Sequence, residues 1–286
     1  MREEDRIRVL STTGMIHDVV SQVGGDRIAS LCLFGGEIDP HSYEMVKGDA
    51  EKLMRAQLIF YNGLGLEHGA SLRYQLEHHE RAIALGQTIA SKFPEEMIWV
   101  DGEIDPHVWM DLHLWSEIID PIVEALSDLD PDGRAFFETN RARVRAAMDA
   151  ENELVFTSLQ RIPATRRYLV TSHDAFNYFG RAYLADQGHW KERVMAPEGL
   201  APDGQMSSKD IQELIDHLRQ YEIHTLFPES NVSPDALKKI AQTSRKLGLA
   251  VQVSRDPLYG DAMGTMTYLE MMRYNARVLC ETWESQ

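Results

Sequence analysis

The tripeptide Asp-Pro-His occurs twice in this chain, at Asp39-Pro40-His41 and at Asp105-Pro106-His107. Proline restricts its own backbone and that of the residue before it, so each copy makes a stiff turn. The aspartate can hold such a turn by hydrogen bonds to nearby backbone groups. Each histidine is therefore expected at a strand or loop end, where two imidazoles could share a metal ion. Since Asp-Pro is also a common turn opener, coincidence is the alternative.

Two further candidate ligands lie in the second half of the chain. His173 directly follows an apolar predicted strand, the position that His41 occupies in the first half, and Asp261 lies in a loop after another predicted strand. Taken singly, His173 could be the first residue of a helix, and Asp261 a turn residue or helix cap. Together with His107 they make three imidazoles and one carboxylate. This donor set suits Zn²⁺, Mn²⁺, Fe²⁺ or Co²⁺ better than Ca²⁺ or Mg²⁺.

Other polar residues are weaker candidates. Glu229 follows a predicted strand and could orient a ligating imidazole, or be a surface acid. His68 and His113 are expected in helices near the proposed site and are not assigned as ligands. Cys32 and Cys280 are far apart and form no CxxC motif, which favours buried free thiols over a metal site.

Strand-like and helix-like segments alternate along both halves of the chain. Strands are predicted at 8–12, 28–34, 58–61, 168–172, 225–227 and 250–253, and helices at 15–23, from 48, 66–79, 174–183, 207–221, 233–247 and 265–283. The helix from 48 is expected to use Glu51 in a capping box. Such alternation predicts an α/β fold with parallel sheets, and ligand sites in such sheets gather at the carboxyl ends of strands.

A long helix separates the two halves. The segment from Arg134 to Gln160 contains neither glycine nor proline, and at 1.5 Å per residue it would be about 40 Å long. We therefore predict an N-terminal lobe at 1–130, a rigid linking helix at 131–162 and a C-terminal lobe at 163–286. Residues 185–206 are rich in glycine, proline and polar side chains and are predicted to form a long surface loop.

Composition narrows the class of protein. The chain is 43% hydrophobic and 26% charged, as in soluble globular proteins. It has 45 acidic and 29 basic residues and a net charge of −16, which argues against binding to nucleic acid or to anionic membranes. No apolar run approaches the roughly 20 residues of a membrane span. The sequence contains no HExxH, P-loop, GxSxG or EF-hand motif.

Several segments resemble the metal-ion solute-binding proteins of ABC transporters, and among these the TroA and YtgA type. The resemblance spans nearly the whole chain in order. It rests on the segments Ser11-Thr12-Thr13-Gly14-Met15-Ile16, Asp39-Pro40-His41-Ser42-Tyr43, Phe60-Tyr61-Asn62-Gly63-Leu64, Asp105-Pro106-His107-Val108-Trp109-Met110-Asp111, Val170-Thr171-Ser172-His173-Asp174-Ala175-Phe176 and Asp261-Ala262-Met263-Gly264.

This resemblance implies two lobes joined by the long helix, with a metal ion held by His41, His107, His173 and Asp261. It implies that the ion is cargo, a zinc, manganese or iron ion delivered to a cognate ABC permease, and that the protein is not an enzyme. An extracytoplasmic location is also implied, with a signal segment absent from the given sequence. We expect a monomer that binds no nucleic acid.

Two other classes of function are alternatives. A metal-dependent hydrolase would need an open coordination position and a general base, for which Glu229 is the only nominee. An adhesin or structural protein with an incidental metal would keep its metal affinity when His41 or His107 is replaced.

Overall fold

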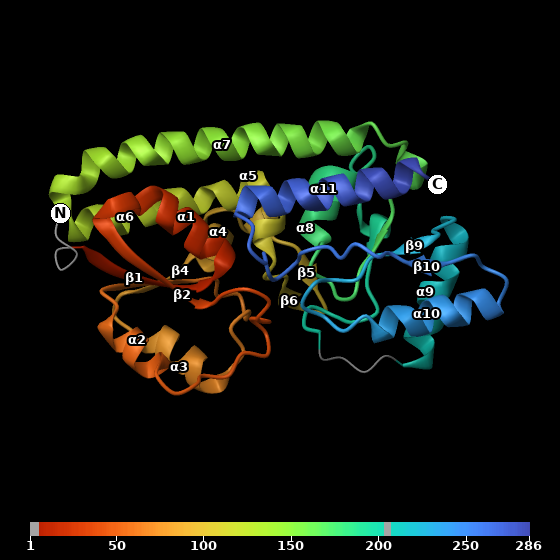
Figure 1. Ribbon diagram of the computed structural model, residues 1–286, viewed down its shortest axis with the longest axis horizontal. Helices are drawn as coiled ribbons and strands as arrows, with labels where there is room; N and C mark the ends of the chain where they lie inside the picture. The colour runs from red at the N-terminus through yellow and green to blue at the C-terminus, as the bar shows by residue number, and fades with distance from the viewer. Residues whose placement is uncertain (1–5, 203–206) are drawn as a thin grey trace. The chain divides into compact units, whose positions relative to one another are not determined.

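The computed structural model describes residues 6–202 and 207–286, which form two units (Figure 1). The first unit comprises Met1–Glu151 together with Ala262–Leu269. The second comprises Asn152–Asp261 together with Glu270–Gln286.

The long helix α7 spans Arg134–Gln160, the bounds that its freedom from glycine and proline predicts. The division between the units falls inside this helix, after Glu151. The predicted three-part division, at residues 130 and 162, treats the helix as a separate part and assigns 262–269 to the C-terminal lobe. That division stays a prediction.

The first unit is built on a parallel four-stranded sheet in the order β2-β1-β3-β4. Its strands are β1 (Ile7–Thr13), β2 (Ile28–Phe34), β3 (Leu58–Tyr61) and β4 (Ala82–Ala84). The central strand β1 is buried along nearly its whole length, as expected for a parallel strand covered on both faces. Three of these four strands and their parallel pairing agree with the sequence-based expectation.

Helices cover both faces of this sheet (Figure 1). On one face lie α1 (Gly14–Gly24), α4 (Leu85–Lys92) and α6 (Ile119–Leu129), and on the other lie α2 (Asp49–Arg55) and α3 (Ala70–His78). Leu53, Leu72 and Leu76 of the second group pack against strand residues such as Leu10 and Ile59 to form one apolar cluster. A short hairpin, β5 (Trp99–Val100) and β6 (Glu103–Ile104), and the short helix α5 (Leu112–Trp115) complete the unit.

The second unit contains two short parallel pairs. β7 (Leu169–Val170) pairs with β8 (Val194–Met195), and β9 (Thr225–Leu226) pairs with β10 (Gln252–Val253). The backbone nitrogen of Phe227 donates to the oxygen of Val170, which brings the ends of β7 and β9 together. The helices are α8 (Asn177–Phe179), α9 (Ser208–Gln220), α10 (Asp235–Lys246) and α11 (Tyr268–Glu284). A core that includes Leu214, Leu226 and Ile240 lies between the strands and α9 and α10.

Some predicted elements are shorter than expected or replaced. The strand predicted at 168–172 is ordered as β7 only at Leu169–Val170, and the helix predicted at 174–183 is α8 followed by a π-helical turn, Gly180–Leu184. The predicted loop 185–206 contains the strand β8; its residues 203–206 lie outside the described residues. Backbone hydrogen bonds to other segments decide these outcomes, and local sequence does not reveal such partners.

The start of α2 also differs from the prediction. Its first residue follows Gly48, which has a φ of 102° and offers no side-chain cap, so no capping box with Glu51 forms. The buried carboxylate of Asp49 instead accepts from the Tyr43 hydroxyl at 2.5 Å, the Val46 backbone nitrogen at 2.8 Å and the Lys52 ammonium at 2.9 Å. Asp49 thereby ties the preceding loop to the helix.

Across 6–202 and 207–286, no helix combines the length and apolar character needed to cross a membrane. The capping box predicted at Ser207 and Asp210 is present at the start of α9.

Arg27 and Asp130 supply a pH-dependent stabilisation that can be measured. They form two contacts, Nε to Oδ2 at 2.6 Å and Nη2 to Oδ1 at 2.9 Å, between the turn after α1 and the turn after α6. These hydrogen bonds hold the pKa of Asp130 below its ordinary value. The stabilisation is therefore complete above the unfolded-state pKa, near 4, and is lost as the pH falls through the lower folded-state value.

We expect Asp130→Asn to lower the free energy of unfolding by about 1 kcal/mol at pH 7, with the difference from wild type shrinking below about pH 4. Denaturant unfolding at several pH values measures this. Asp132→Asn, an exposed aspartate in the same turn, is the matched control. A difference that stays constant down to pH 3 would contradict the assigned cause.

Candidate metal centre

His41 follows the carboxyl end of β2, in a loop fixed by the aspartate of its own tripeptide. Oδ1 of Asp39 accepts from the backbone nitrogen of His41 at 2.8 Å, and Oδ2 accepts from the Ser42 hydroxyl at 2.7 Å. The histidine is buried, with 6% of its surface exposed. The turn is thus held as predicted, with the aspartate bonded to backbone and the imidazole left to face other groups.

His107 follows β6 and is held more completely than His41. Oδ1 of the fully buried Asp105 accepts from the backbone nitrogen of His107 at 2.9 Å and lies 2.7 Å from its Nδ1. Because the carboxylate accepts from Nδ1–H, the lone pair of the neutral ring lies on Nε2. The imidazole is therefore fixed in both orientation and tautomer.

The two histidines present the same nitrogen to each other. Nε2 of His41 lies 3.2 Å from Nε2 of His107, and both rings belong to the first unit. Two nitrogens bound to one ion at about 2.1 Å, with bond angles between about 90° and 109°, lie about 3.0–3.4 Å apart. The pair therefore fits two ligands of a single transition-metal ion.

A buried frame that sequence reasoning missed supports His107. The carboxylate of Glu67 accepts from the backbone nitrogens of Asn62 and Gly63, at 2.8 and 3.0 Å, and from the Thr12 hydroxyl at 2.8 Å. The Asn62 amide in turn donates to the carbonyl of Pro106 at 3.0 Å. Complete burial raises the pKa of Glu67, against these hydrogen bonds. Glu67 thus shapes the turn after β3, and Asn62 connects that turn to the residue before His107.

His173 follows β7 in the second unit and is buried beside Glu229. Oε1 of Glu229 accepts from the backbone nitrogens of Ser172 and His173, at 3.0 and 2.9 Å, while its Oε2 lies 2.8 Å from Nδ1 of His173. A Cβ atom at Gly260 would come within 2.7 Å of that Oε2, so the glycine leaves room for the carboxylate. This arrangement directs Nε2 of His173 away from Glu229.

Asp261 lies on the other side of the same imidazole. Its Oδ2 is 3.0 Å from Nε2 of His173, and both side chains are fully buried. Burial disfavours the charged imidazole, but the carboxylates of Glu229 and Asp261 outweigh it and hold the pKa of His173 well above its ordinary value. A metal ion bound at Nε2 takes the place of a proton there. The 3.0 Å separation again fits two ligands of one ion.

The sequence-predicted ligands thus form one pair in each unit. The structure brings His41 and His107 together in the first unit, and His173 and Asp261 together in the second. Burial raises the pKa of the Cys32 thiol to about 11, which makes this residue a poor metal ligand at neutral pH.

Comparison with known proteins is consistent with this donor set. Residues 9–282 match the family described as ZnuA, zinc-uptake complex component A, periplasmic. The chain belongs to the ZnuA family. The metal-binding protein YtgA of Chlamydia trachomatis is 38% identical over 97% of this chain and 86% of that protein. The zinc-binding protein TroA of Treponema pallidum is 32% identical over 93% of this chain and 85% of that protein.

Solved structures of the same relatives share the fold. The crystal structure of Fe(III)-bound YtgA from Chlamydia trachomatis matches with a TM-score of 0.92 and 37% identity, over 97% of this chain and 98% of that chain. Periplasmic zinc-binding TroA from Treponema pallidum matches with a TM-score of 0.88 and 30% identity, over 97% and 99%. The predicted α/β class, with parallel sheets and one long helix, is confirmed.

Membership of the ZnuA family answers the question of class. Its members are metal-binding components of ABC metal transporters and not enzymes, so the hydrolase alternative is not supported. A transporter component implies a permease partner. The family is described as periplasmic, and the relatives MntA of Bacillus subtilis and PsaA of Streptococcus pneumoniae are lipoproteins.

Several residues near the ligand pairs differ from the sequence-based picture. His68 is not in a helix but in the loop between β3 and α3, because the Asn62–Glu67 segment winds around the Glu67 carboxylate and α3 begins only at Ala70. His113 does lie in a helix, α5. The contact of Asp105 with Nδ1 and the Glu67 frame were not predicted; the repeated aspartate was the available signal for the first.

Replacing Glu229 tests whether it orients His173. The carboxylate can only accept from Nδ1–H, whereas a glutamine amide can also donate and so favour the tautomer whose Nε2 carries the proton. We expect Glu229→Gln to weaken metal binding about 10- to 100-fold with little loss of stability. Competition titration with a zinc chelator and thermal unfolding measure the two effects.

Glu213→Gln is the matched control, since this exposed glutamate of the second unit lies on α9 and pairs with Lys209 at 3.3 Å. Unchanged zinc affinity in Glu229→Gln would show that the carboxylate supports the loop without governing the imidazole.

Proposed function

We propose that this protein captures one divalent transition-metal ion with His41, His107, His173 and Asp261 and delivers it to an ABC permease. The observation that carries the proposal is the repeated ligand spacing. Each unit holds two buried donor atoms about as far apart as two ligands of one ion, at 3.2 Å in one and 3.0 Å in the other. Neither pair alone fills a four-coordinate shell, so one ion joining both pairs satisfies all four donors.

The cargo that this donor set supports is zinc, manganese or iron. Three imidazoles and a carboxylate accept all three ions, and selectivity in such sites comes from geometry and metal availability more than from donor type. The relatives' names agree with this range, since TroA is a zinc-binding protein, MntA a manganese-binding lipoprotein, and one YtgA structure is bound to Fe(III).

In this proposal the lobes at 1–130 and 163–286 each contribute one ligand pair, and the helix at 131–162 links them. An ion that binds both pairs stabilises the folded protein by mass action. Release then requires only that one pair loosens. Glu229 orients His173 from behind, as Asp105 orients His107.

The protein would work outside the cytoplasm as a monomer beside its permease. The periplasmic description of the family and the lipoprotein relatives support this location. A net charge of −16 disfavours nucleic acid as a partner.

Calorimetric titration of metal-stripped protein with Zn²⁺, Mn²⁺ and, under anaerobic conditions, Fe²⁺ tests this function. Wild type should bind one ion per chain. Because each replacement removes a buried donor, His41→Ala, His107→Ala, His173→Ala and Asp261→Ala should each weaken binding at least about 100-fold. At an ion concentration 100 times Kd, wild type should gain about 2.7 kcal/mol of stability, visible as a higher Tm.

His224→Ala is the control, since this histidine of the second unit is exposed and its Nδ1 contacts the Ala250 carbonyl at 3.2 Å. If His41→Ala and His107→Ala keep wild-type affinity, the metal is incidental and an adhesin or structural role becomes the better explanation. If only one pair matters, the ion does not join the two.

A further inference from the structure

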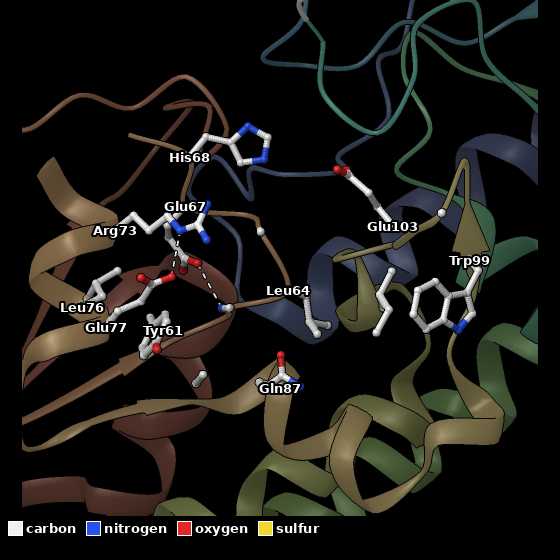
Figure 2. A pocket seen from close by; sticks show the side chains of 15 residues that line it. Tyr61, Leu64, Glu67, His68, Arg73, Leu76, Glu77, Gln87, Trp99 and Glu103 are labelled. Atoms are coloured by element: carbon white, nitrogen blue, oxygen red, sulfur yellow. Dashed lines mark hydrogen bonds and ion pairs between the residues drawn. The ribbon is translucent and has the colours of Figure 1, made fainter. Parts of the chain in front are cut away.

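A cavity of about 730 Å³ opens in the first unit beside the His41 loop. It lies between the end of β3, the helix α3 and the β5–β6 hairpin, and its lining includes His68, Arg73, Glu77, Trp99 and Glu103 (Figure 2). The family ligands His41 and His107 are not among its lining residues. The cavity is therefore a separate feature of this unit that borders the ligand pair.

His68 connects the cavity to the ligand pair. It is exposed in the loop before α3, whereas His41 is buried, and the two rings meet edge to face with centroids 5.5 Å apart at 82°. His68 thus presents an imidazole to solvent while its ring contacts the ring of the buried His41. Residues 66–69 were predicted to begin a helix, but they form a loop instead, and this loop places His68 at the surface.

The charge of the cavity favours cations. Glu67, Glu77 and Glu103 line it, against a single basic residue, Arg73, whose Nε contacts Glu77 at 2.8 Å. Figure 2 shows the His68 ring and the Glu103 carboxylate extending to the same open side of the cavity. Because Arg73 pairs with Glu77 and the carboxylate of Glu67 is buried, the exposed Glu103 is the acidic group that favours cations here, and a charge at the mouth of a cavity raises the local concentration of counter-ions.

We propose that His68 is a capture ligand, which binds an incoming metal ion at the mouth of the cavity and transfers it to His41 and His107. The inference rests on the proposed function and adds a route of arrival to it. An exposed imidazole can replace one water of a hydrated ion while the remaining waters stay in place. The ion then needs to move only from His68 to the adjacent ring of His41 to reach the buried pair.

Geometry separates this role from that of a permanent ligand. His41 and His107 are buried with their Nε2 atoms 3.2 Å apart, whereas His68 contacts His41 by its ring and remains exposed to solvent. His68 should therefore change the rate of binding and not its equilibrium. A group that contacts the ion only on its way to the site changes the association and dissociation rates by the same factor, so Kd stays the same.

Stopped-flow fluorescence with Co²⁺ tests the proposal on the full chain. Trp109 serves as reporter because its ring lies 5.3 Å from that of His107, and bound Co²⁺ quenches a nearby indole. We expect His68→Ala to slow both association and dissociation about tenfold, within the range by which charge and capture groups alter on-rates. The Kd from calorimetry should remain that of wild type.

Two further variants sharpen the result. His78→Ala removes an exposed histidine of the same unit whose ring stacks on Tyr74, and it should bind Co²⁺ at the wild-type rate. Glu103→Gln should slow association mainly at low salt, because the effect of a cavity-lining charge is screened as ionic strength rises.

The outcomes are separable. Wild-type rates in His68→Ala overturn the capture role while leaving the proposed function intact. A rise in Kd as large as that of His41→Ala also overturns it, because His68 would then be a permanent ligand. Failure of the wild-type protein itself to bind Co²⁺ or Zn²⁺ would remove the proposed function and, with it, the capture role.

Discussion

A buried carboxylate fixed against Nδ1 of a histidine is the interaction on which each candidate ligand pair depends. Asp105 holds His107 in this way in the first unit, and Glu229 holds His173 in the second. In both cases the same carboxylate also accepts from the histidine's own backbone nitrogen, so ring and chain are fixed together. An imidazole whose Nδ1–H is held by a carboxylate offers only Nε2 as a donor atom, and this restriction suits both buried histidines to the metal-binding role proposed for them.

Two of the candidate ligands follow strands of parallel pairs. His41 follows β2 and His173 follows β7, each at the carboxyl end of a strand in a parallel pair. Strand ends of this kind free the chain to turn while the sheet behind them stays rigid, which is why α/β proteins place ligand sites there. The turn after β3 serves a supporting purpose, because Glu67 and Asn62 use it to hold the carbonyl of Pro106.

Burial differs between the residues proposed to hold the metal ion and the residues proposed to meet it first. The four proposed ligands are each at most 6% exposed, so water would compete poorly for an ion that they hold. In the first unit, the exposed residues His68 and Glu103 line the cavity next to His41, where we propose that they meet ions still in solution. The zinc-binding protein TroA and a YtgA structure bound to Fe(III) share this fold, and the manganese-binding lipoprotein MntA is 30% identical in sequence, which agrees with a donor set that accepts several borderline ions.

The sequence by itself determined the fold class and the bounds of α7, and it supplied His41, His107, His173 and Asp261 as the candidate ligands. It could do so because proline turns, apolar strands and a glycine-free helix are local signals. Tertiary structure alone decided that Asp105 reaches Nδ1, that Glu67 organises the turn after β3, and that His68 leaves the helix predicted for it. Each of these depends on a hydrogen-bond geometry or a partner that only folding supplies, and no spacing in the chain encodes such a contact.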